Sequence, residues 1–340
     1  MLTRFVVGAS RAIVWAAFLG LSIPAVAHPA PGIVVDSREN VYFVDFTRDR
    51  IMKIDPSGKV SVFADGTKDQ LFSVPHHLSI DAAGDLVTAS DRGGKIVRIA
   101  ADGKMTLVYP PVDWYGINFI GAGGDPFAID AAGNIYGTNY RQFRFIQILK
   151  IAPDGRLEVL AGGAIGAVDG KRDAARFREP HSMAFAIGPE KALFVSDLTA
   201  IRKIDADGLV TTFAGGAEAG DKDGRGPEAR FSGLAGINFD ARGNLWAADH
   251  AASKIRIIAP DGAVTTFPFS KQRPPTSAPD GSYRRDEEIR QTTLHPFGVA
   301  VGPSGKVYVL DYPLSDDPRV SRIERDGSVT TLCVVGKNLE

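Results

Sequence analysis

The sequence predicts an all-β protein, a six-bladed β-propeller built from four-stranded antiparallel blades. A four-strand pattern occurs six times along the chain, at a spacing of roughly 40 to 50 residues. Within each copy, short segments of alternating apolar and polar residues are separated by Asp-Gly, Ser-Gly or Ala-Gly turns, which is typical of antiparallel meanders. One such sheet cannot bury both faces, whereas six arranged radially bury each face against a neighbour.

The six copies fill most of the chain after a short leader. Each copy contains all four of its strands, so the predicted ring closes by contact between the first and sixth blades, without a strand borrowed from the other terminus. We expect the blades at about residues 30–65, 75–109, 125–161, 180–214, 234–267 and 296–334.

Residues 1–27 resemble an export signal. Arg4 and Arg11 give a positive start, Ala12–Pro24 is apolar, and Ala25-Val26-Ala27 is a small-residue cleavage site. The alternative is a membrane anchor, but the uninterrupted apolar run is shorter than the ~18 residues of a membrane span. We therefore expect a single mature domain at residues 28–340, periplasmic or secreted, with no membrane span after signal removal.

The charge bears on whether nucleic acid is a partner, and the cysteine content bears on whether a disulfide stabilises the fold. The formal net charge is −1, and removal of the leader takes it to −3, so no basic face for nucleic acid is indicated. Cys333 is the only cysteine, so an internal disulfide cannot form and the domain must rely on its apolar core. We expect a monomer.

The repeat resembles that of the NHL family of propellers. The resemblance is carried by G-N-I-Y and G-N-L-W turns at Gly133 and Gly243, and by I-x-K-I-D strands at Ile51 and Ile201. It is also carried by a link that occurs twice at identical spacing, Asp169-Gly170 to Ala175-Arg176-Phe177 and Asp223-Gly224 to Ala229-Arg230-Phe231. The resemblance implies a rigid face that presents loops to proteins, glycans or peptides.

Acidic residues close the second strand of most copies, and we expect them to accept backbone N–H groups of the following turn. They are Asp45, Asp91, Asp197, Asp249 and Asp311.

Two longer links depart from the repeat and are expected at the mouth of the central channel. Pro110–Gly124 carries Trp114 and Tyr115, and Ser270–Leu294 is polar. Both join an outer strand to the next inner strand, so they lie on the face where inner strands begin, and added loops on a rigid scaffold commonly carry function. The leading prediction is therefore recognition of a small molecule, peptide or protein at this face. Its predicted contact residues are His77, Trp114, Tyr115 and Phe297.

Histidines occur at equivalent positions of two copies. The position of His76 is held in the other copies by Pro31, Asp125, His181, Ala235 and Phe297. Imidazole and carboxylate groups that converge across a narrow channel suit a divalent metal, so His76, Asp125 and His181 are a candidate zinc site. His295 lies two residues before the equivalent position of the sixth copy and is a fourth candidate ligand. The alternative is that each histidine begins a strand and forms only local hydrogen bonds.

A narrower resemblance concerns the segments Pro75-His76-His77-Leu78 and Pro180-His181-Ser182. They look like the Pro-His turns of the peptidyl-α-hydroxyglycine α-amidating lyase, a six-bladed propeller with a catalytic zinc. Phe297 occupies the place of that family's third histidine. The resemblance implies a lyase in which zinc polarises a substrate oxygen. It also implies a catalytic arginine, Arg48 or Arg50, and a catalytic tyrosine, Tyr140.

Two further enzymatic activities are also compatible with the sequence. A hydrolase that uses zinc-bound hydroxide fits the same residues. Gluconolactonase-like and paraoxonase-like propellers hold calcium in the channel, and Asp125 and Asn118 are candidate ligands for that ion, although the Glu-Gly-Pro turn of gluconolactonases is missing.

Overall fold

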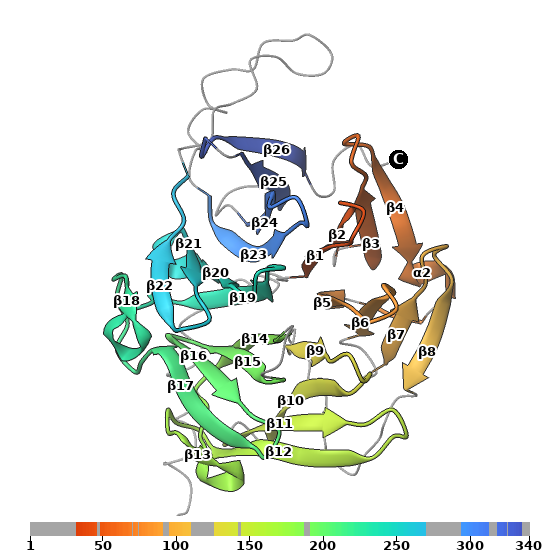
Figure 1. Cartoon of the computed structure of the whole chain (residues 1–340). Helices are drawn as coiled ribbons and strands as arrows, with labels where there is room; N and C mark the ends of the chain where they lie inside the picture. Colours follow the sequence, from red (N-terminus) through yellow and green to blue (C-terminus); the bar gives the residue numbers. More distant parts are fainter. Residues whose placement is uncertain are drawn as a thin grey trace, which may run out of the picture.

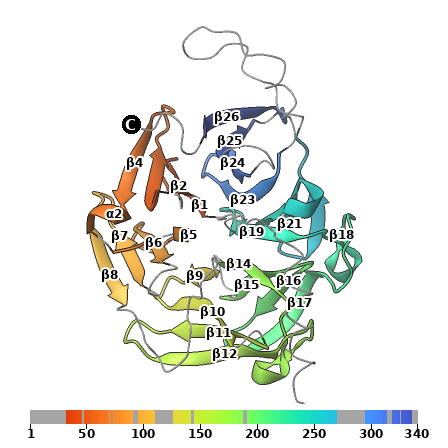
Figure 2. The same ribbon diagram turned by 180° about the vertical axis from the view of Figure 1, so that it is seen from behind.

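The computed structural model describes residues 32–45, 48–69, 71–73, 75–90, 95–109, 126–141, 144–186, 191–269, 294–312, 318–324 and 326–334. Within these residues the strands form six antiparallel sheets arranged in a ring (Figure 1), and Figure 2 shows the same ring from behind. The six-bladed propeller is confirmed. The predicted signal peptide lies outside the described residues, and no helix in the described part is long and apolar enough to cross a membrane.

Blades one to three are meanders of four strands. Blade one contains β1 (Ile33–Val35), β2 (Val41–Asp45), β3 (Arg50–Ile54) and β4 (Val60–Asp65), and the short α2 (Gly66–Asp69) follows it. Blade two contains β5 (Pro75–Ile80), β6 (Leu86–Ser90), β7 (Ile96–Ile99) and β8 (Met105–Tyr109). Blade three contains β9 (Phe127–Ile129), β10 (Ile135–Arg141), β11 (Phe145–Ile151) and β12 (Leu157–Ala164).

Blades four to six complete the ring. Blade four contains β14 (Pro180–Phe185), β15 (Leu193–Asp197), β16 (Ala200–Ile204) and β17 (Leu209–Gly215), with β13 (Gly170–Lys171) and η1 (Arg172–Ala174) before them. Blade five contains β19 (Leu234–Phe239), β20 (Leu245–Asp249), β21 (Lys254–Ile258) and β22 (Ala263–Thr266), with β18 (Gly224–Arg225), η2 (Gly226–Glu228) and η3 (His250–Ala252). Blade six contains β23 (Pro296–Val301), β24 (Val307–Asp311), β25 (Arg319–Ile323) and β26 (Val329–Val334).

The turn after each inner strand shows how the repeat specifies a hairpin. In blade three, Asp130 Oδ1 accepts the backbone N–H groups of Ala132 and Asn134, each at 2.9 Å. Its Oδ2 accepts from Asn134 Nδ2 at 2.7 Å and from the Tyr136 hydroxyl at 3.0 Å. Gly133 has φ +80°, a conformation that favours glycine, so the G-N pair is required by the turn geometry.

The ring closes by packing between blades one and six. Ile33 and Phe43 of blade one share a buried apolar cluster with Ala300 and Leu310 of blade six. Glu39, at φ +64°, accepts a hydrogen bond from the backbone N–H of Ser304 at 2.6 Å. Among the described residues, closure needs no exchanged strand, as predicted, because β1 to β4 and β23 to β26 each form a four-stranded sheet.

Blades four and five differ from the predicted four strands, because each carries a fifth strand on its outer edge. β13 pairs with β17, and β18 pairs with β22. Asp169 accepts hydrogen bonds from Arg202 Nη2 at 2.8 Å and from Thr212 Oγ1 at 2.9 Å, and Phe177 packs under the Arg202 guanidinium at 5.3 Å. The repeated D-G to A-R-F link therefore folds back over the blade edge, and its aspartate and phenylalanine hold one buried arginine.

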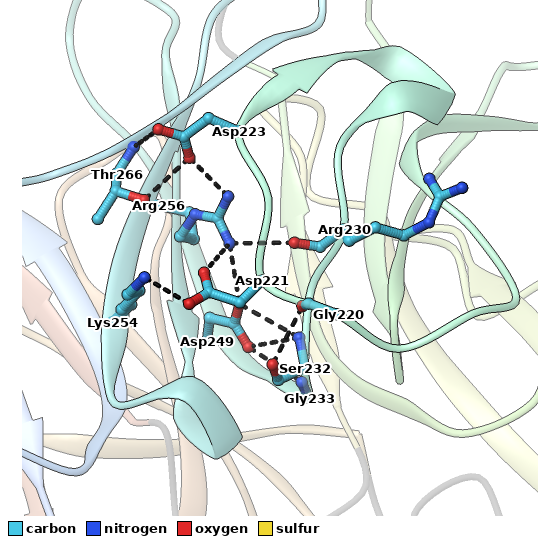
Figure 3. Close-up of polar contacts among 10 residues, drawn as sticks. All are labelled: Gly220, Asp221, Asp223, Arg230, Ser232, Gly233, Asp249, Lys254, Arg256 and Thr266. Carbon is cyan, nitrogen blue, oxygen red and sulfur yellow. Dashed lines mark hydrogen bonds and ion pairs between the residues drawn. The ribbon is translucent and has the colours of Figure 1, made fainter.

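Three of the strand-ending aspartates differ from prediction. Asp197, Asp249 and Asp311 accept N–H groups from the residues that precede the inner strand of the same blade, not from the following turn. Asp249 Oδ1 accepts from the backbone of Ser232 and Gly233, each at 3.0 Å, and its Oδ2 accepts from Arg256 Nη1 at 3.1 Å. Figure 3 shows this network around Arg256, including Asp223, which directly precedes the added strand β18. In blade two, the hydroxyl of Ser90, the last residue of β6, accepts from the backbone N–H of Ser73 and donates to its carbonyl, while Asp91 lies outside the described residues.

Candidate functional site

The inner strands surround a central cavity of about 1160 Å³. Its wall is mainly apolar in the middle, with His77 and Ser182 at the level where inner strands begin and the aspartate turns at the opposite end. The apolar wall includes Ile33, Leu78, Phe127, Met183, Ile237 and Val299. A cavity whose wall combines apolar side chains with polar groups, as this one does, suits a small molecule that has both kinds of surface.

His76 and His77 lie in a β-bulge of β5, where the pairing shifts between Pro75 and Leu78. Both side chains are buried. His77 lines the cavity and meets the ring of Phe127 edge-on, with 6.4 Å between centroids. The carbonyl of His76 accepts the backbone N–H of Gly32 at 3.0 Å, which ties blade two to blade one. The bulge thus turns one histidine of the pair into the channel.

His181 bridges blades four and five. Its Nδ1 lies 2.8 Å from the carbonyl oxygen of Leu234, and its Nε2 lies 3.1 Å from Glu179 Oε1. The Leu234 carbonyl accepts from Nδ1–H and an ionised Glu179 carboxylate accepts from Nε2–H, so this arrangement favours the protonated ring. Burial lowers the pKa of His181, but the hydrogen bonds to Glu179 and Leu234 outweigh it and leave this pKa raised.

Two further histidines gather beside it, from blades five and six. The ring centroids of His250 and His295 are 6.3 Å apart, and His250 packs on Phe297 at 3.9 Å. Phe297 in turn meets Tyr312 edge-on at 5.5 Å. Burial, followed by the nearby His295 and His181, lowers the pKa of His250 to about 4, so this ring is neutral near pH 7. We call His181, His250, His295, Phe297 and Tyr312 the mouth cluster.

His250 was not predicted, although the repeat holds a signal for it. It directly follows Asp249, the last residue of β20, and Tyr140 and Tyr312 occupy the same place in blades three and six. When the blades are aligned on their second strand, rather than on their first, these aromatic and imidazole residues occupy equivalent positions. In blade six this position lies beside the start of the inner strand, because Tyr312 donates its N–H to the His295 carbonyl at 3.1 Å.

The remaining predicted residues lie elsewhere or cannot be placed. Arg48 Nη1 is 3.4 Å from Asp45 Oδ2, and Arg50 Nε is 3.2 Å from Asp65 Oδ2, so both arginines form ion pairs within blade one. Phe297 belongs to the mouth cluster. Several predicted residues or side chains lie outside the described part of the chain: Trp114, Tyr115, Asn118, Asp125 and the side chain of Tyr140.

The described residues do not fit a bound metal as they stand. Among them, no group of three or more His, Cys, Asp and Glu side chains is arranged to hold an ion. His181 would have to give up its hydrogen bond to Leu234 or to Glu179, and lose a proton, before that ring nitrogen could bind zinc. Because Asp125 lies outside the described residues, the zinc and calcium sites stay predictions.

The comparisons with known proteins establish the fold. No protein-family profile and no curated protein matches the chain. Among solved structures, virginiamycin B lyase from Staphylococcus aureus is 17% identical, with 90% of this chain and 84% of that chain covered and a TM-score of 0.51. A gluconolactonase from Xanthomonas campestris is 15% identical, over 84% and 85%, with a TM-score of 0.53. An auxiliary nutrient binding protein from Bacteroides ovatus is 16% identical, over 83% and 66%, with a TM-score of 0.54. The chain therefore shares the six-bladed propeller fold of a lyase, a lactonase and a binding protein.

Proposed function

We propose that the protein is an exported propeller that binds a small-molecule or peptide ligand at the end of the channel formed by the mouth cluster. The observation that carries this proposal is the packing of imidazole and aromatic rings from blades five and six at the level where the inner strands begin, with His181 of blade four near enough to lower the pKa of His250. Aromatic and imidazole side chains offer large contact areas and polar edges at little cost in conformational entropy. The fold similarity to a nutrient binding protein supports the same reading.

The cavity gives the ligand a place to extend. Its volume of about 1160 Å³ exceeds what a drug-sized molecule needs, and its apolar wall would cover the less polar part of a ligand. His77 and Ser182 line the same cavity at the end nearer the inner-strand starts. A ligand with a polar or planar head and an apolar extension therefore suits the site best.

Thermal unfolding in the presence of a panel of metabolites and short peptides tests this proposal. A ligand that binds the folded state raises Tm in a concentration-dependent way. We expect the increase to shrink in His250→Ala and Phe297→Ala but to remain in Arg225→Ala, because Arg225 pairs with Asp261 on the exposed outer edge of blade five. Ligands that stabilise all four proteins equally would contradict a site at the mouth cluster.

A lyase or hydrolase is the second candidate, and it rests on two neighbouring histidines whose pKa values are shifted in opposite directions. The pKa of His181 is raised and the pKa of His250 is lowered to about 4, a separation expected of a general acid beside a general base. The fold similarities to virginiamycin B lyase and gluconolactonase support an enzymatic reading.

A metal-dependent form of this enzyme would use His76, Asp125 and His181, and metal analysis of the purified mature protein tests it. Stoichiometric zinc or calcium that is lost in His76→Ala would support this form, and its absence from both proteins would contradict it.

A further inference from the structure

Ser253 and His295 face each other across the boundary between blades five and six. Ser253 Oγ lies 3.3 Å from His295 Nδ1, and both residues are partly buried. Ser253 is the residue directly before β21, and His295 is the residue directly before β23. A serine hydroxyl within reach of an imidazole nitrogen is the first requirement of an activated nucleophile, and such contacts are often long in the absence of substrate.

The backbone of Ser253 is held in a conformation that serine rarely adopts. Its φ and ψ are +54° and +42°, in the left-handed region, and its N–H donates to the carbonyl of His250 at 3.0 Å. Asp49 holds the equivalent place before β3, with φ +54°. Aspartate is among the residues that are enriched in the left-handed region. Blade one therefore has a common residue type at this position, whereas blade five has serine. Strained residues of this kind concentrate at functional sites, because the surrounding structure must hold them.

His295 is fixed from its backbone on the other side of the pair. Its N–H donates to Asp311 Oδ1, and its carbonyl accepts from the N–H of Tyr312 at 3.1 Å. Asp311 is buried and held by Arg319 Nε at 2.6 Å, so the residue that positions His295 cannot swing away. The backbone that carries this imidazole is thus rigidly held, which is the support that a catalytic base requires.

We propose that Ser253 is a nucleophile and His295 its general base, and that the pair attacks the carbonyl carbon of an ester or lactone. Ser253 Oγ forms a bond to this carbon while its proton passes to His295 Nδ1. The carbon–oxygen bond of the alcohol breaks, and His295 returns the proton to the departing alkoxide. Water then repeats the sequence on the acyl-serine, with His295 taking its proton, and releases the carboxylic acid and free Ser253. This activity goes beyond ligand binding at the mouth cluster and needs no metal.

A fluorophosphonate probe tests the pair without knowledge of the substrate. The probe forms a bond between phosphorus and an activated serine oxygen and releases fluoride, so the labelled protein is detected by intact mass. Trypsin cleavage after Arg242 and Lys254 releases residues 243–254, in which Ser253 is the only serine. We expect the label on this peptide in the full-length mature protein.

Three variants separate catalysis from folding. Ser253→Gly removes the hydroxyl but suits the left-handed backbone, so we expect it to fold at least as stably as wild type and to lose the label. His295→Gln should lower the labelling rate by about 100-fold or more, the usual contribution of a general base. Ser232→Ala, a control that loses only the hydroxyl bonded to Gly220, should label at the wild-type rate. No label on residues 243–254 of wild type, or an equal rate in His295→Gln, would overturn the proposal. Ligand binding at the mouth cluster would still be measurable in either case.

Discussion

The guanidinium of Arg256 lies 3.1 Å from the carboxylate of Asp249, measured from Nη1 to Oδ2, and both side chains are 0% exposed. We expect Arg256→Met to lower the free energy of unfolding by about 3–5 kcal/mol, because Asp249 would remain buried without its charged partner. Burial already raises the pKa of Asp249, and the nearby Arg256 opposes that rise. Urea unfolding followed by tryptophan fluorescence measures the loss, since Trp246 lies in the adjacent strand β20.

Arg225 provides the matched control for this prediction. Its pair with Asp261 is mostly exposed, at 62% and 57%, so Arg225→Met should cost about 0–1 kcal/mol. Similar losses in the two arginine variants would show that burial of the Arg256 pair does not determine its effect.

His250 should make the protein less stable in mild acid. Its pKa falls from an ordinary 6.5 to about 4 in the folded state, so the unfolded chain takes up a proton first as the pH drops. The contribution of this ring to stability is complete above pH 6.5 and is lost as the pH falls from 6.5 towards 4. Unfolding measured at several pH values should show a smaller acid loss in His250→Phe than in wild type. An unchanged dependence in the variant would refute the assignment.

His181 should have the opposite dependence. Its pKa is raised in the folded state, so its stabilising contribution is complete below the ordinary value of 6.5 and is lost as the pH rises through the raised value. An NMR titration of the imidazole C–H signals should give a midpoint above 6.5 for His181. Glu179→Gln should lower this midpoint, because the hydrogen bond to Glu179 is the main cause that raises it. A midpoint at or below 6.5 in wild type would contradict the raised pKa of His181.

Glu39 should contribute to closure of the ring. Its carboxylate accepts from the Ser304 N–H at 2.6 Å across the boundary between blades one and six. Glu39→Ala should cost about 1–3 kcal/mol, because a hydrogen bond to a charged group is lost while the backbone keeps its φ of +64°. Chemical denaturation checks the value, with Glu228→Ala at the exposed end of η2 as control. Equal midpoints for these two alanine variants would argue against this contact.

The blades were predictable because their information is local. The hydrogen bonds of the turn that contains Asp130, Asn134 and Tyr136 all form within seven residues. The alternation of apolar and polar residues and the turn residues therefore identify each hairpin. The fifth strands were not predictable in this way. Asp169, the aspartate next to β13, binds Arg202, which lies 33 residues further along the chain. The sequence shows that the link repeats, but not that it folds back over a blade edge.

The site was predicted only in part, for a similar reason. Equivalent positions on the first strand locate His76, His181 and Phe297, and the structure does bring His181 and Phe297 into one cluster. The protonation state of His181 depends on the Leu234 carbonyl, which a β-bulge in the next blade turns towards it. His250 and Ser253 lie in the turn after the second strand of blade five. This turn is longer than the corresponding turn of blade four.

Each blade is folded from one continuous run of chain, and this has a topological consequence. The order in which the blades follow one another along the chain is not what holds the ring together, since each sheet is complete before the next begins. A circularly permuted protein, with its original ends joined and new ends placed in a link between blades, outside β13 and β18, would therefore keep every strand pairing of the native ring.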